Sequence, residues 1–173
     1  SADSGDNGTS EGRYLPSQAG IVAAFDNTKI IFTLGGNALT KTSGGIKPGE
    51  SKSWSLQKGD VLLISSFGKG ADLSGSKVVA DKPVGVISGN YCVYVPDGLT
   101  SSCNHTVEME LPTYTWGKEY VVTKIFGQQK NSFVKIMAKE PNTRVYRNGE
   151  HIATIQEAGG IEDIGYISRR LSN

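Results

Sequence analysis

Residues 72–122 read DLSGSKVVADKPVGVISGNYCVYVPDGLTSSCNHTVEMELPTYTWGKEYVV. This stretch holds both cysteines, the second of the two tryptophans and one of two Asn-X-Thr motifs. Its β-branched runs at 77–80 and 84–88 flank Pro83, which lacks a backbone donor and disfavours helix at Lys82. The pattern therefore predicts a strand, a turn and a second strand.

The pair Gly89-Asn90 is expected to break the chain before a third strand at 91–95, which ends at a Pro-Asp-Gly turn. Three interpretations of the cysteines stay open: a Cys92–Cys103 disulfide, a metal site that adds His105 and Glu108, or two unrelated buried thiols. Structural zinc sites usually have closely spaced CxxC-type ligands, which this chain lacks. The spacing favours the disulfide.

The same stretch resembles the IgGFc-binding protein N-terminal domain family. The resemblance implies an extracellular β-rich module of the kind found in mucin-like animal proteins and bacterial surface proteins. The chain departs from the family pattern after the histidine, where an acid-then-Gln pair is replaced by Glu108-Met109-Glu110. The matching residues are Asp72, Leu73, Gly75, Pro83, Val84, Val86, Ser88, Gly89, Cys92, Pro96, Cys103, His105, Glu108, Leu111, Pro112, Trp116, Gly117 and Tyr120.

Composition points to an exported β protein without an electrostatic partner. The 173 residues include 18 Lys+Arg and 17 Asp+Glu, for a net charge of +1, which favours no nucleic-acid ligand. The 22 glycines suit many short strands and turns, and no apolar run approaches the length of a membrane span. The sequence begins at Ser1 without a charged-then-apolar signal segment, as expected of a mature secreted product.

Small polar residues dominate the first part of the chain, so residues 1–20 are predicted to be a flexible leader or a donor strand. Asn7 and Asn104 begin the two glycosylation motifs, and both are expected in exposed loops. Unmodified surface asparagine is the alternative for each.

Strands are expected along the rest of the chain. Residues 61–65 form a continuous apolar run, which predicts a strand buried on both faces. Asn148-Gly149 is the strongest hairpin signal, because both residues tolerate positive φ. The other expected strands are 20–24, 29–34, 38–42, 53–56, 119–126, 133–138, 143–146 and 151–155.

A weak repeat relates residues 21–70 to residues 136–173, on either side of the central 72–122 segment. Asn27-Thr28-Lys29-Ile30 matches Asn142-Thr143-Arg144-Val145, and Gly44-Gly45-Ile46 matches Gly159-Gly160-Ile161 at the same offset. The second copy reaches the end of the sequence sooner, so it is expected to lack a strand.

A sheet that lacks a strand has unpaired backbone groups that need cover. A neighbouring subunit could donate a strand made from Tyr14, Leu15, Ile21 and Val22, as in strand-complemented pili. The alternatives are that residues 162–168 close the sheet within the chain, or that the sequence is a fragment.

Catalytic signals are weak, and no catalytic residue is assigned. His105 with Glu108 or Glu110 could act as base and acid, but the two glutamates should share one solvated face of a strand. His151 lies beside a hairpin turn and is expected to be exposed. No cofactor is expected; calcium is the open alternative, through loop aspartates Asp3, Asp6, Asp26, Asp72 and Asp97.

The sequence thus predicts an all-β protein, antiparallel and sandwich-like, built as one domain or as two related halves. Its predicted role is an extracellular structural or adhesive module that assembles with its own copies, as in a filament, or binds surface partners. A carbohydrate-binding module is the first alternative and a secreted hydrolase the second. The candidate glycan or partner contacts are Tyr91, Tyr94, Tyr114 and Trp116, with core packing as the other interpretation of Trp116.

Overall fold

The computed structural model describes residues 15–36, 41–42, 44–68, 70–94, 102–123 and 132–167. Among the described residues, the regular secondary structure is β apart from one short 3-10 helix, η1 (Thr113–Thr115), which confirms the all-β class. It divides into two compact units, Ser1–Leu111 and Pro112–Asn173. The boundary falls inside the 72–122 stretch that the sequence marked as one central segment.

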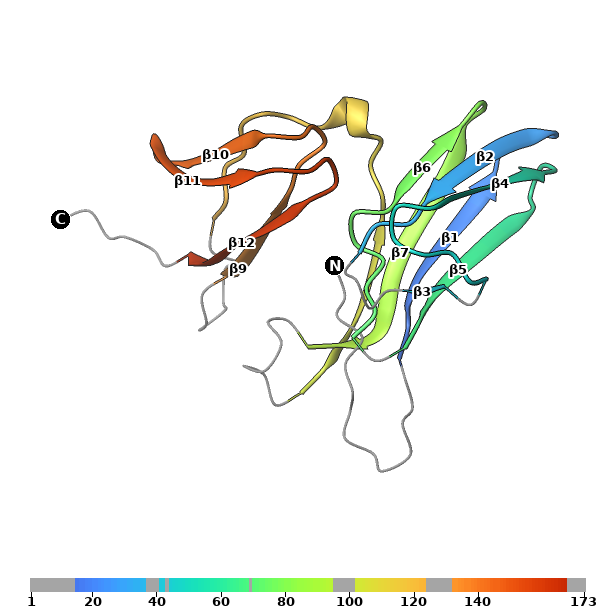
Figure 1. Cartoon of the computed structure of the whole chain (residues 1–173), viewed down its shortest axis with the longest axis horizontal. Helices are drawn as coiled ribbons and strands as arrows, with labels where there is room; N and C mark the ends of the chain where they lie inside the picture. The colour runs from blue at the N-terminus through green and yellow to red at the C-terminus, as the bar shows by residue number, and fades with distance from the viewer. Residues whose placement is uncertain are drawn as a thin grey trace. The chain divides into compact units, whose positions relative to one another are not determined.

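The described residues of the first unit form two antiparallel sheets (Figure 1). The larger has the order β3-β5-β1-β7-β8, and the smaller has the order β4-β2-β6. Strands that follow one another in the sequence are therefore often not adjacent in a sheet. The strands are β1 (Ser17–Ala23), β2 (Thr28–Thr33), β3 (Lys41–Thr42), β4 (Ser51–Leu56), β5 (Val61–Phe67), β6 (Lys77–Ala80), β7 (Val84–Val93) and β8 (Asn104–Met109).

The core of the first unit lies between these two sheets, as in a sandwich. Alternate residues of β1 and β2 are buried, and Ile21 and Ile30 are completely inaccessible. Burying each such side chain contributes roughly 1.5–3 kcal/mol. The buried cluster is Ala19, Ile21, Ile30, Phe32, Leu34, Ile46, Ile64 and Leu73.

The expected break at Gly89-Asn90 is wrong, because β7 runs through both residues. Gly89 pairs with Gln18 on one side and Val107 on the other. Asn90 is buried, and its side chain donates to the Leu15 carbonyl at 3.0 Å and accepts from the Cys92 amide at 2.8 Å. A side chain with both functions satisfied costs little inside a strand, so the ladder shifts register only after Asn90.

The placement of Ile21 and Val22 corrects their assignment to a spare donor strand. Both lie in β1, which pairs with β5 along one edge and β7 along the other within its own chain. Leu15 precedes β1 and its carbonyl is bound by Asn90, while Tyr14 lies outside the described residues. A strand with both edges paired has no free ladder to offer a neighbour.

The described part of the second unit contains four strands: β9 (Ser132–Met137), β10 (Thr143–Arg147), β11 (Glu150–Ile155) and β12 (Ile161–Ile167). β9 pairs with β12 and β10 with β11, both antiparallel. Asn148 and Gly149 adopt positive φ in the β10–β11 turn, as the hairpin signal predicted. The buried core is small: Ala138, Val145 and Ile155. Residues 119–123 are not in a strand, contrary to expectation.

Candidate binding face

The apolar strand β5 is covered on one side only, which overturns the expectation that it is buried on both faces. Ile64 points into the core, whereas Val61 and Leu63 are 65% and 60% exposed. Phe67, in the same alternation, is also exposed. Apolar residues on both faces of a strand can indicate that another layer packs against each face. Here the second layer is absent from the described residues.

The exposed side of β5 continues across the larger sheet. Val22 stands opposite Val61 on β5, and Ile87 stands opposite Met109 on β8. We call this surface the outer face, and its large apolar residues are all at least a third exposed. They are Val22, Val61, Leu63, Phe67, Ile87, Tyr91, Val107 and Met109.

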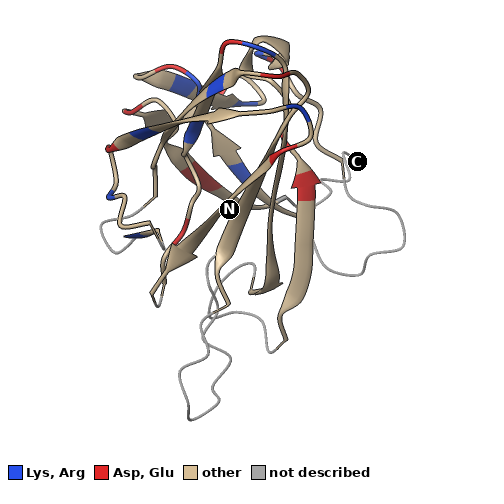
Figure 2. Cartoon of the chain, turned by 90° about the vertical axis from the view of Figure 1, so that its right-hand side faces the viewer, with Lys and Arg blue, Asp and Glu red and all other residues tan. Residues whose placement is uncertain are grey.

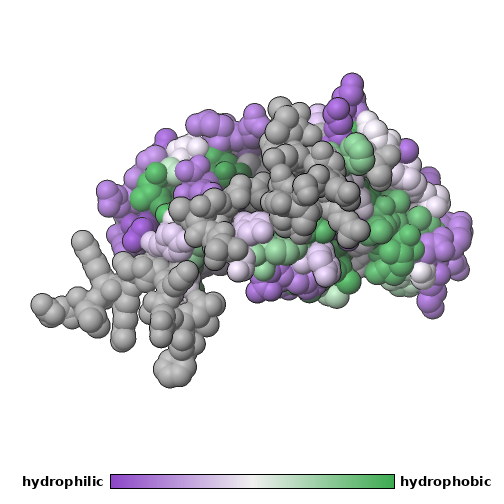
Figure 3. All heavy atoms as spheres, turned by 90° about the horizontal axis from the view of Figure 1, so that it is seen from below, coloured by the Kyte–Doolittle hydropathy of each residue, from purple (hydrophilic) through white to green (hydrophobic). Residues whose placement is uncertain are grey.

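Few polar side chains interrupt the outer face. Gln18 and Ser65 lie on it and are joined by a 3.2 Å hydrogen bond, and Lys41 lies at one end, opposite Phe67. No carboxylate lies on it among the described residues of the five strands. Figure 2 shows charged residues at turns and also on strands, and Figure 3 shows apolar residues grouped in one area of the first unit.

The opposite outer surface, on the smaller sheet, provides a contrast. Its β4 positions are Ser51, Ser53 and Ser55, which pair with Thr33, Ile31 and Lys29. The large exposed apolar residues there are one cross-strand pair, Ile31 and Val79, which lies beside serines of β4. Monomeric proteins rarely leave a contiguous apolar surface on ordered strands without a partner, so the outer face is the candidate site.

Glycines near the centre of the outer face leave that part of the sheet without side chains. Gly20 and Gly85 flank Val22 and Ile87, and a Cβ on Gly85 would meet Val22 Cγ1 at 3.0 Å. At Gly89 a Cβ would collide with the Thr106 carbonyl of β8. Because these glycines have no side chains, β8 can approach β7 closely. The large apolar residues of the outer face therefore project beyond the glycines between them.

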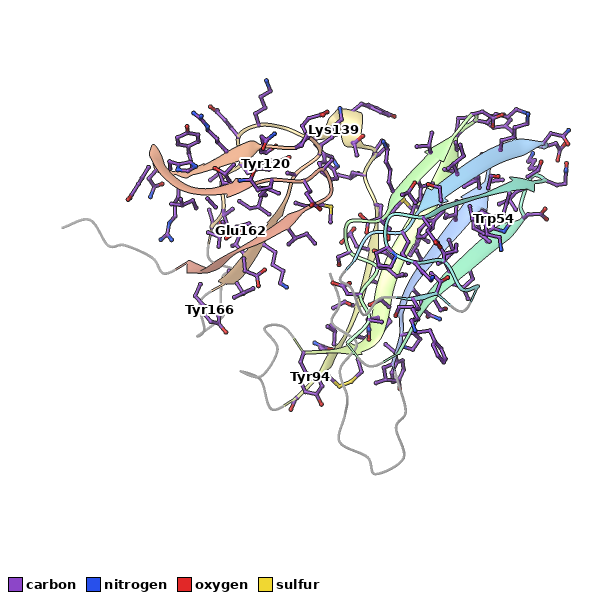
Figure 4. All side chains as sticks on the ribbon, viewed as in Figure 1. Trp54, Tyr94, Tyr120, Lys139, Glu162 and Tyr166 are labelled. Carbon is purple, nitrogen blue, oxygen red and sulfur yellow. A yellow bond between two sulfur atoms is a disulfide. The ribbon has the colours of Figure 1, made fainter. Side chains whose placement is uncertain are left out.

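The predicted disulfide between Cys92 and Cys103 is present, with Cα atoms 5.1 Å apart. It links the end of β7 to the residue before β8, at one end of the outer face. Tyr91 stacks edge-on against His105 across this region, with ring centroids 6.4 Å apart. Figure 4 shows Tyr94 near the same end. Disulfide-bonded sulfurs are not available as thiolate ligands, so the metal interpretation of the cysteines is wrong.

The four predicted aromatic contacts fall in different units. Tyr91 is 72% exposed and Tyr94 half-buried in the first, whereas Tyr114 is 84% exposed and Trp116 half-buried in the second. Only Tyr91 belongs to the outer face. The role of these residues in binding stays a prediction.

His105 and the two glutamates do not form an acid–base pair. His105 alternates with Glu108 and Glu110 along the chain, so it points to the opposite side of β8. Glu110 accepts a short hydrogen bond from Ser88 Oγ. All six residues of β8 are exposed, so no enclosed site surrounds them.

The two described members of the calcium candidates, Asp26 and Asp72, serve turns. Asp72 Oδ1 accepts from the Ser74 amide at 3.0 Å and hydroxyl at 2.7 Å, and Asp26 Oδ1 accepts from the Lys58 amide at 2.9 Å. The described residues contain no group of three or more His, Cys, Asp or Glu placed to hold a metal ion. Asp3, Asp6 and Asp97 lie outside them, and calcium binding stays untested.

Of the two glycosylation candidates, Asn104 lies among the described residues. Asn104 is exposed at the first position of β8, where a glycan would have room, and its Oδ1 accepts from the His105 amide at 2.9 Å. Asn7 lies outside the described residues. Modification of either remains a prediction.

The β10–β11 hairpin carries a shallow hollow that the sequence did not predict. It measures about 420 Å³ and is lined by Arg144, Tyr146, His151 and Thr154. His151 Nε2 lies 3.0 Å from Thr154 Oγ1, and its ring is edge-on to Tyr146 with centroids 5.4 Å apart. Arg144 opposes Thr154 and Tyr146 opposes His151 across a register shift, so the sequence shows this grouping only once the pairing is known.

The sequence of this chain matches a known protein family. The family model described as IgGFc binding protein matches residues 5–166. A human protein named IgGFc-binding protein is 33% identical over 129 residues, which is 75% of this chain. The chain spans only 2% of that protein's length. No solved structure matches, and no helix in the described part is long and apolar enough to cross a membrane.

Proposed function

We propose, since the chain belongs to the IgGFc-binding protein family, that it is a non-catalytic extracellular module that binds a protein partner through the outer face. The observation that carries the proposal is the run of exposed apolar residues across four neighbouring strands, without a carboxylate among them. Apolar, ordered surfaces of this kind bind other proteins.

Rigidity supports the same role. The outer face is the reverse side of a sheet whose inner residues are locked in the core, so it needs little ordering when a partner docks. The disulfide supports an oxidising, extracellular setting. The human relative's name describes binding of an immunoglobulin region; for this chain we propose only the class of partner, an extracellular protein with an apolar docking surface.

Photo-crosslinking tests the proposal. A benzoyl-phenylalanine at Leu63 or Val107 should capture the same extracellular protein, and Ser55 provides a matched exposed control on the smaller sheet. Adding unlabelled chain should compete for this capture, whereas adding the Leu63→Glu variant should compete at least tenfold less, the penalty of about 1.4 kcal/mol or more for desolvating an unpaired charge.

The other outcomes discriminate between alternatives. Crosslinks only between copies of the chain would favour the self-assembling module over a separate partner. Equal capture from Leu63 and Ser55 would refute the outer face as the site. Binding on a glycan array that is lost in Tyr91→Ala, without protein crosslinks, would favour the carbohydrate-binding module.

A further inference from the structure

The second unit repeats four strands of the first in the same order. In the first unit β1 pairs with β5 and β2 with β4; in the second β9 pairs with β12 and β10 with β11. The registers also agree: Val22 opposes Val61 as Met137 opposes Ile161, and Thr28 opposes Leu56 as Thr143 opposes Ile155. β9, β10, β11 and β12 thus correspond to β1, β2, β4 and β5.

The turns agree in detail. Asn27 and Asn142 have φ of 53° and 56°, and the hydroxyls of Thr28 and Thr143 each donate at 2.6 Å to a carbonyl three residues earlier. The Ala138 amide donates to the Gly160 carbonyl at 3.0 Å, as the Ala23 amide does to Asp60 at 3.1 Å. Gly159-Gly160 therefore corresponds to Gly59-Asp60, which corrects the match to Gly44-Gly45 that the sequence indicated.

The two units differ in how the second edges of corresponding strands are paired. In the first, β7 pairs along the second edge of β1 and β6 along the second edge of β2. Among the described residues, β9 pairs only with β12 and β10 only with β11. Burial follows the pairing, because Ile21 is fully buried whereas its counterpart Ile136 is only half-buried.

We propose that the open edges of β9 and β10 accept a strand–turn–strand segment of the β6–β7 kind, which adds one antiparallel strand to each sheet. The internal repeat defines this occupant: an extended polypeptide with alternating apolar residues and a tight turn, like residues 77–90. Strand addition at an exposed edge is driven by main-chain hydrogen bonds, and apolar side chains fix its register. This inference is independent of the outer face.

Backbone geometry identifies the receiving amides. The Ala23 amide donates toward β5 and the Ala24 amide toward Pro83, beside β7, so donors alternate between the two edges. The Ala138 amide donates toward β12 in the same way. By alternation the amides of Lys135 and Met137 face the open edge, and those of Val134 and Ile136 face β12.

Hydrogen exchange on the ¹⁵N-labelled chain tests this directly, with the peptide KVVADKPVGVISGN (residues 77–90) as the probe. In the free chain, Lys135 and Met137 should exchange faster than Ile136. Saturating peptide should slow both by about tenfold or more, as for amides that enter a stable ladder. A control peptide with Pro in place of isoleucine at position 87, whose backbone faces β1 in the intact sheet because that of Val86 faces β8, should leave their exchange unchanged.

A pair of variants tests whether the peptide binds at the open edge of β9. Met137→Pro removes an open-edge donor while keeping the β12 hydrogen bonds, which edge strands tolerate, and should abolish the effect at Lys135. Met137→Ala keeps the amide and should retain it. If Met137→Pro disrupts the amide spectrum of the second unit, Lys135→Pro replaces it, with exchange read at Met137. If both variants disrupt the spectrum, the comparison of the probe peptide with the control peptide on the unmodified chain still tests the proposal.

Three results would overturn the proposal. Lys135 and Met137 could fail to respond to saturating peptide. They could already be protected in the free chain at every concentration, which would mean that the edge is covered. They could become protected as the chain itself is concentrated, which would make a second copy the occupant.

Discussion

Two glycines of the larger sheet show how a single residue sets the distance between strands. A Cβ at Gly89 would sit 2.3 Å from the Thr106 carbonyl oxygen, whereas a Cβ at Gly20 would meet nothing within 4 Å. Neither glycine has a positive φ, so the difference between them is space alone. Gly89 is thus required for the approach of β7 to β8, and Gly20 is not.

We therefore predict that Gly89→Ala destabilises the first unit by about 1–3 kcal/mol through overpacking against backbone. Gly20→Ala is the matched control and should be neutral or stabilising by up to about 1 kcal/mol, since alanine restricts the unfolded chain. Urea unfolding followed by tryptophan fluorescence measures both. Equal midpoints for the two variants would contradict the close approach of β8.

At the scale of elements, β8 depends on the disulfide more than on its own packing. It is the last strand of its sheet, and all its residues are exposed. Cys92 and Cys103 are 11 positions apart and close a short loop between β7 and β8. Such a crosslink stabilises by roughly 2–3 kcal/mol in the chain-entropy model.

Replacing both cysteines with serine should lower the unfolding free energy by about that amount, roughly 2–3 kcal/mol. The loss should be local first: amides of β8 should exchange faster while those of β1 and β2 keep their protection. Exchange measured by mass spectrometry resolves the strands. Uniform loss across the unit would show that β8 is integral to the core rather than held by the crosslink.

At the scale of the molecule, the two units differ in how much they bury. Among the residues that the structure describes, the main buried apolar cluster has eight members in the first unit and three in the second. The segment that begins the second unit exposes Tyr114, Tyr120 and Val121 at 84%, 71% and 93%. A small core with open edges supplies less stability to set against chain entropy.

We expect the whole chain to unfold in two steps, with residues 132–167 losing exchange protection at a lower urea concentration than β1 and β2. Limited chymotrypsin digestion should cut first at Tyr114 or Tyr120 and leave the disulfide-linked first unit intact. A single cooperative transition, or a first cut within β1–β7, would contradict this order of stability.

Much of this protein was readable from the sequence alone. The predicted strands at 29–34, 77–80 and 143–146 correspond to β2, β6 and β10, because strand-forming runs and the turn residues that bound them are local features. The Asn148-Gly149 hairpin and the disulfide followed from residue chemistry, and the family from the residues around Cys92 and Cys103. These features depend on neighbours in the chain or on rare residue types.

Only the tertiary structure decided which strands pair and which faces stay uncovered. Nothing local tells that β1 lies between β5 and β7, or that Val61 and Leu63 face outward while Ile64 faces the core. An apolar strand has the same sequence whether one layer or two cover it. The candidate binding face and the open edges of the second unit both arise from long-range pairing, because coverage is a property of what packs against a strand.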